Sequence, residues 1–112
     1  MTQQADLVER LRTLLAEAPS TREVSMFGGR SFMVNDKMVV SALKDGDLLV
    51  RVDAGRHDEL LRHPGATQAE MGRGRVMGPG WINLSAASIA GDEDLSFWLG
   101  VGLEHNRVST RR

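Results

Sequence analysis

Hydrophobic residues recur along this chain with two periods, one typical of helices and one typical of strands. Near the start they fall on one face of a helix predicted over residues 5–17, and this face consists of Leu7, Val8, Leu11, Leu14 and Leu15. Ala18-Pro19-Ser20 ends the predicted helix, because proline lacks the backbone donor that a helix needs. Polar residues take the opposite face, so we expect the leucine face to pack on a sheet.

Three strands are predicted next, within residues 24–34, at 37–43 and at 48–52. We interpret Gly28-Gly29 as a β-bulge in the first strand, since glycine tolerates positive φ and a bulge leaves one residue unpaired. A close approach of a ligand to this backbone is the alternative. Asn35-Asp36 and Asp45-Gly46 are typical of hairpin turns, so the three strands should form an antiparallel meander.

The second half of the chain predicts two helices and two strands. Asp53 is a candidate N-cap for the first of these helices, near residues 55–62. The other predicted elements are a strand at 66–71, a glycine-rich connection, a strand at 81–85, a helix from about Asp92 and a frayed tail at 108–112. Gly100 and Gly102 each cost the last helix about 1 kcal/mol against alanine. They either allow close packing on the sheet or make the helix irregular.

The predicted order of elements is α-β-β-β-α-β-β-α. The simplest architecture with this order is a two-layer α+β fold, with an antiparallel sheet and helices mainly on one face. A chain of 112 residues suits a single domain over residues 1–112, with an ordered core at about 5–105.

Composition excludes several classes of site. No cysteine is present, which rules out disulfides, thiolate nucleophiles and cysteine-based zinc sites. The N-terminus lacks the pattern of a signal peptide, and no apolar run approaches the roughly 20 residues that span a bilayer. We therefore expect a cytoplasmic protein that does not enter a membrane. The net charge of −1 provides no overall field to attract nucleic acid.

Several stretches resemble a known family. Met26-Phe27-Gly28-Gly29, followed by Phe32-Met33-Val34-Asn35-Asp36-Lys37-Met38, is similar to the opening motif of the TfoX N-terminal domain family. The segments Leu48–Leu61 and Gly74–Trp81 are also similar. The resemblance implies an α+β domain of the type grouped with secretion-chaperone-like folds. In its named members this domain belongs to a regulator of natural competence and precedes a helical domain. We expect a single-domain member that lacks the helical domain.

Residues that could carry out chemistry show no catalytic or metal-binding pattern. His57, His63 and His105 lack the i, i+4 spacing of a helical metal site, so we predict surface histidines and no bound metal. Ser25 and Ser31 lie outside any Gly-x-Ser-x-Gly motif. The family supplies no established catalytic residues either. We expect no enzymatic activity and no cofactor.

Two functions remain open. The first is a small interaction or regulatory domain that binds a protein partner or forms a homodimer, since an exposed edge strand needs protection. The alternative is an accessory domain that binds nucleic acid or an anion through arginine-rich loops, with Arg30, Arg73 and Arg75 as the candidate ligands. A surface map separates the two, because the second function requires these arginines to converge and the first favours a broad exposed apolar patch.

Overall fold

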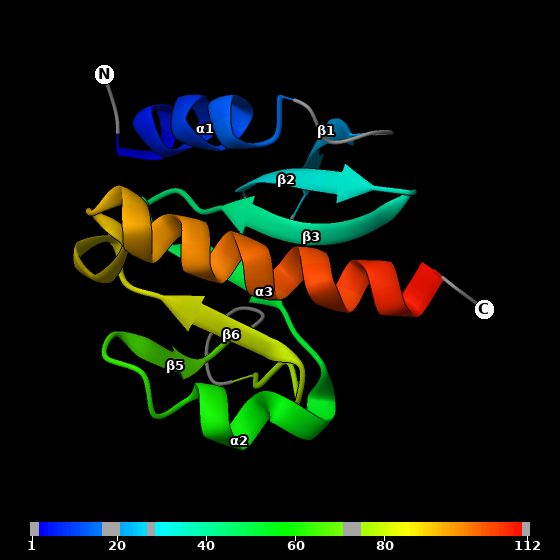
Figure 1. Ribbon diagram of the computed structural model, residues 1–112. Coiled ribbons are helices and arrows are strands. Elements are labelled where there is room, and N and C mark those ends of the chain that lie inside the picture. The colour runs from blue at the N-terminus through cyan, green and yellow to red at the C-terminus, as the bar shows by residue number, and fades with distance from the viewer. Residues whose placement is uncertain (1–2, 17–20, 27–28, 71–74, 111–112) are drawn as a thin grey trace.

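Helices and antiparallel strands build this molecule in two layers (Figure 1). The computed structural model describes residues 3–16, 21–26, 29–70 and 75–110. Its α-helices are α1 (Gln3–Leu14), α2 (His57–Leu60) and α3 (Asp92–Thr110), and its 3₁₀ helices are η1 (Ala54–Arg56) and η2 (Ala86–Ile89). Its strands are β1 (Thr21–Met26), β2 (Gly29–Val34), β3 (Lys37–Ala42), β4 (Leu48–Arg51), β5 (Ala66–Gln68) and β6 (Trp81–Leu84).

The described strands form one sheet in the order β1-β2-β3-β4-β6-β5, and every neighbouring pair is antiparallel. The predicted α+β class with an antiparallel sheet is therefore confirmed. The predicted count of strands before α2 is one too low. The stretch interpreted as one bulged strand is the hairpin of β1 and β2, in which Met26 pairs with Gly29. Gly28 lies outside the described residues.

Position 29 requires glycine, because the neighbouring strand leaves no room for a side chain. A Cβ atom there would lie 2.7 Å from the carbonyl oxygen of Ala42 and 2.9 Å from Oγ of Ser41.

The sheet does contain a β-bulge, but it lies in β3 and not at Gly29. Phe32 pairs with Val40 and Met33 pairs with Met38, so Val39 is the extra residue.

The predicted turns are confirmed, and their backbone angles explain the residues chosen. Asn35 and Asp36 have φ values of 53° and 64°, which these residue types tolerate and which a two-residue hairpin turn favours. Gly46 has a φ of 89° in the connection between β3 and β4. Asp53 caps η1, since its side chain accepts a hydrogen bond from the backbone of Gly55 at 3.1 Å.

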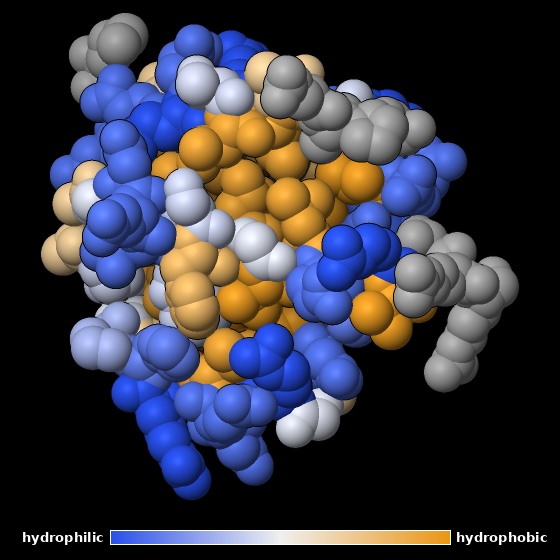
Figure 2. Space-filling view, in the orientation of Figure 1, coloured by the Kyte–Doolittle hydropathy of each residue, from blue (hydrophilic) through white to orange (hydrophobic). Residues whose placement is uncertain are grey.

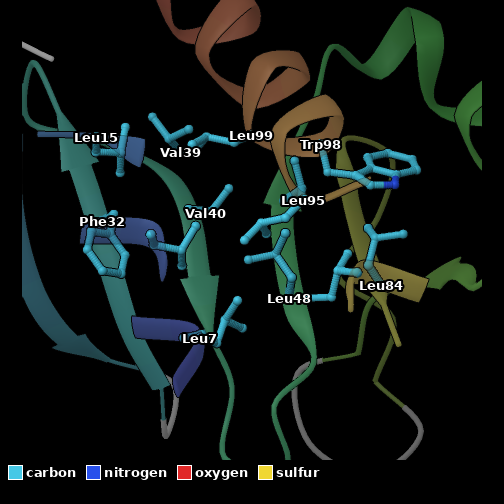
Figure 3. Close-up of a cluster of buried hydrophobic side chains, with 14 of the residues drawn as sticks. Leu7, Leu15, Phe32, Val39, Val40, Leu48, Leu84, Leu95, Trp98 and Leu99 are labelled. Atoms are coloured by element: carbon cyan, nitrogen blue, oxygen red, sulfur yellow. The ribbon is translucent and has the colours of Figure 1, made fainter. Parts of the chain in front are cut away.

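The main core lies between the sheet and the helices α1 and α3 (Figure 3). Leu7 and Leu15 extend from the α1 side, and Leu95, Trp98 and Leu99 extend from α3 toward Val39, Val40, Leu48 and Leu84. Fully burying such a side chain stabilises the fold by about 1.5–3 kcal/mol. The leucine face predicted near the start of the chain thus packs on the sheet.

Helix α3 is longer than its sequence suggests. Val108 and Ser109, predicted as part of a frayed tail, lie in its last turns. The buried side chain of Asn106 explains the extension, because its Nδ2 donates to the carbonyl oxygen of Val34 at 2.9 Å. No helix in the described part of the chain is long and apolar enough to cross a membrane.

The opposite face of the sheet carries a smaller apolar cluster. Its buried members are Met38, Leu49 and Ala69, and its partly buried members are Met33, Leu43, Met77 and Trp81. The guanidinium of Arg51 lies 4.9 Å from the centre of the Trp81 ring, a cation–π contact. This contact fixes Arg51 at the end of β4.

Candidate functional site

The arginines predicted as an anion site do not come together in the described structure. Arg30 is exposed on β2, and its guanidinium lies 3.9 Å from the carboxylate of Glu23. Arg75 is exposed next to Val76, which bridges Glu70 beyond β5. Three strands lie between β2 and β5, a separation of about 19 Å at the usual strand spacing. Arg73 lies outside the described residues.

Charged side chains line the edge strand β1. Arg12 of α1 donates to both carboxylate oxygens of Glu23, at 2.7 and 2.9 Å. These hydrogen bonds hold the pKa of Glu23 below its usual value. Arg22 pairs with Asp36 at 3.2 Å. Charges along an edge oppose pairing with a further strand, so β1 is protected without a partner.

His57 is buried, only 4% exposed, which makes the prediction of a surface histidine wrong at this position. Its Nδ1 accepts a hydrogen bond from the backbone of Gly80 at 2.9 Å, and its Nε2 donates to Oε1 of Gln68 at 2.7 Å. Gln68 in turn donates to the carbonyl oxygen of Gly78 at 2.9 Å. Both ring nitrogens are occupied, so His57 ties α2 to the glycine-rich connection before β6.

The other two histidines have different surroundings. His63 is exposed, and its ring centre lies 5.1 Å from that of Phe97 and 5.3 Å from that of Trp98. His105 is partly buried in the last turns of α3. Among the described residues, no three histidine, aspartate or glutamate side chains gather in a way that could hold a metal ion.

Three apolar side chains lie along the outer side of α3, with the exposed Glu104 between the second and the third. Phe97, Val101 and Val108 are spaced by four and seven residues, so they share one side of the helix, and we call them the α3 stripe. Phe97 is 44% exposed, Val108 is 54% exposed and Val101 is partly buried. Figure 2 shows hydrophobic side chains gathered over α3 and the space between α3 and α1.

A cavity of about 540 Å³ lies beside the α3 stripe. Val101 and Val108 form its apolar side. Asp53, Arg56 and Glu104 form its charged rim. An apolar strip with a mixed charged rim is the usual anatomy of a protein interface. Sequence reasoning missed this surface, because the predicted frayed tail removed Val108 from the helix.

Comparison with known proteins identifies one family. Residues 13–106 match the family model described as the TfoX N-terminal domain, which covers most of the 112-residue chain. No curated protein and no solved structure matches the chain.

Proposed function

Since the chain belongs to the TfoX N-terminal domain family, we propose that it is a non-enzymatic interaction domain that associates with a second copy of itself through the α3 stripe. The observation that carries the proposal is the exposure of Phe97 and Val108 on one side of a long helix. Isolated exposed apolar residues are common, but a row along one helix favours packing against another helix.

Charge favours an antiparallel arrangement of two α3 helices. The first turn of α3 carries Asp92, Glu93 and Asp94, and its last turn carries Arg107, which is also paired with Glu104 of the same helix. In an antiparallel pair the acidic start of each helix lies beside the basic end of the other. The helix dipoles are then also opposed, which adds a favourable contribution. Phe97 of one copy would lie opposite Val108 of the other.

The edge strand is a weaker route to self-association. Glu23 and Arg22 are held in ion pairs along β1, and joining two such edges would require these charges to be desolvated. The alternative function, nucleic-acid or anion binding through Arg30 and Arg75, also loses support, because β3, β4 and β6 separate them.

Light scattering coupled to size-exclusion chromatography, over a range of micromolar concentrations, tests the proposal. We expect the parent protein to shift toward twice the monomer mass, and Phe97→Ser and Val108→Ser to shift the equilibrium toward the monomer by at least about tenfold. Val76→Ser is the matched control, because Val76 is 62% exposed but lies beyond β5. A parent protein that stays monomeric throughout would refute self-association. A dimer that both stripe variants leave intact would refute the stripe as its interface.

A further inference from the structure

A second cavity, of about 330 Å³, opens where the C-terminal turns of α3 pass the end of the sheet. Lys37 at the start of β3 and Arg51 at the end of β4 contribute cationic side chains to its wall. Adjacent antiparallel strands bring these two positions to the same end of the sheet. His105 and Ser109 of α3 close the other side. This volume falls in the range of small-molecule sites.

The cations of this cavity lack the partners that most other described arginines have. The arginines at positions 10, 12, 22, 30, 56 and 107 each form an ion pair with a carboxylate. Within the described ranges, no carboxylate lies within 4.0 Å of the charged nitrogens of Lys37 or Arg51. Lys37 uses one of its three donors on the carbonyl oxygen of Ser109, at 3.2 Å. The charges of Lys37 and Arg51 are therefore not neutralised by a direct ion pair with a described carboxylate.

Rigid contacts hold each of these groups in place. Arg51 stacks over Trp81, and the Lys37–Ser109 bond joins β3 to α3. Asn106 lies next to His105 in the chain and is buried, with its amide bonded to the carbonyl oxygen of Val34. The ring of His105 lies at the cavity wall, where its Nε2 is 3.3 Å from Oγ of Ser109. Preorganised donors lower the cost of binding a ligand.

We infer that this cavity binds a small organic oxyanion, a phosphate monoester or a carboxylate, between Lys37, Arg51 and the ring of His105. Guanidinium and ammonium donors match the oxygens of both groups. Met33 and Met38 form an apolar wall that suits a short hydrocarbon or aromatic part of the same ligand. The site is separate from the predicted Arg30, Arg73 and Arg75, and it does not rest on self-association.

The charges around His105 agree with this assignment. Burial, together with the positive charges of Arg51 and Lys37, lowers the pKa of His105, and Asp53 partly opposes them. Arg56 and Glu104 face the ring from the neighbouring cavity. Asp36 is the one carboxylate on the wall of the oxyanion cavity among the described residues, and its charge is partly neutralised by Arg22 at 3.2 Å. A bound anion would favour the protonated imidazole and raise this pKa.

Nuclear magnetic resonance of the full chain gives a direct test. The probes are inorganic sulfate, phenyl phosphate and benzoate, and sulfate keeps its charge throughout the pH range used. We expect sulfate to raise the pKa of His105 and to leave His63 unchanged. Tighter binding of phenyl phosphate than of benzoate would identify a phosphate site, and the reverse order would identify a carboxylate site. A pKa of His105 that sulfate leaves unchanged, with no saturable shift from either organic probe, would overturn the inference.

Variants locate the site within the cavity. Lys37→Gln and Arg51→Gln should each weaken binding of the preferred probe by about tenfold. Lys44→Gln and Arg62→Gln are matched controls, since both side chains are exposed and lie outside this cavity. Asp36→Asn should tighten binding several-fold, because it removes the negative charge from the cavity wall. Misfolding cannot produce such a gain. Unchanged affinity in both Lys37→Gln and Arg51→Gln would also overturn the inference.

Discussion

A hydrogen bond between the side chains of His57 and Gln68 joins α2 to β5, and Gln68 also bonds the connection before β6. Gln68→Leu would leave Nε2 of His57 and the carbonyl oxygen of Gly78 without this buried partner. We expect a loss of about 1–3 kcal/mol in the free energy of unfolding, measured by urea denaturation. Thr67→Ala is the control, because its exposed hydroxyl makes one long bond of 3.4 Å. Equal losses in the two variants would contradict the structural role of Gln68.

Residue roles of this kind depend on distant neighbours, which limits what sequence can predict. His57 has polar residues on both sides in the chain, so its burial becomes evident only once the backbone of Gly80 lies against it. Lys37, Arg51 and His105 are likewise far apart in sequence, and the fold alone brings them to one cavity. Asp53 was predictable as a cap, because capping is a local interaction within three residues.

At the scale of the secondary-structure element, two glycines of α3 that are two positions apart have different surroundings. A Cβ at Gly102 would lie 2.8 Å from Cγ1 of Val39 and 3.1 Å from its carbonyl oxygen, whereas a Cβ at Gly100 would meet nothing within 4 Å. Gly102→Ala should therefore destabilise the fold by about 1–3 kcal/mol through overpacking. Gly100→Ala should stabilise it by about 0.5–1 kcal/mol, the helix propensity of alanine over glycine.

Chemical denaturation of the two alanine variants measures whether each substitution lowers or raises the free energy of unfolding. Of the two alternatives that sequence left open for these glycines, close packing applies at Gly102, and no irregularity is required at Gly100. Stabilisation by Gly102→Ala would show that α3 can move away from β3 at little cost.

The strand periods and turn residues could be predicted from sequence because they are local features. The β1–β2 hairpin was not, because the turn signal of Gly28-Gly29 is equally compatible with a bulge.

The pH dependence of unfolding is a property of the whole molecule, because groups at distant places in the fold act on one cooperative transition. Among the described residues, two groups have a pKa below the usual value in the folded state: His105, through burial and the charges of Arg51 and Lys37, and Glu23, through its bonds to Arg12. A lowered pKa in the folded state means that the unfolded chain binds more protons, so stability rises with pH in each window. Stability should therefore fall as pH drops below about 6.5, and again below about 4.5.

Thermal melts at several pH values, in a buffer without phosphate or carboxylate, separate the two contributions. His105→Gln should flatten the first decline, since it removes the ring that the folded state disfavours in its charged form. Glu23→Gln should lower the melting temperature near pH 7, and its difference from the parent should shrink as the pH falls and the parent carboxylate becomes protonated. Glu93→Gln is the control, because this exposed carboxylate has no ion pair in the described structure. A difference between Glu23→Gln and the parent that stays constant over the whole pH series would mean that Glu23 acts through packing and not through its charge.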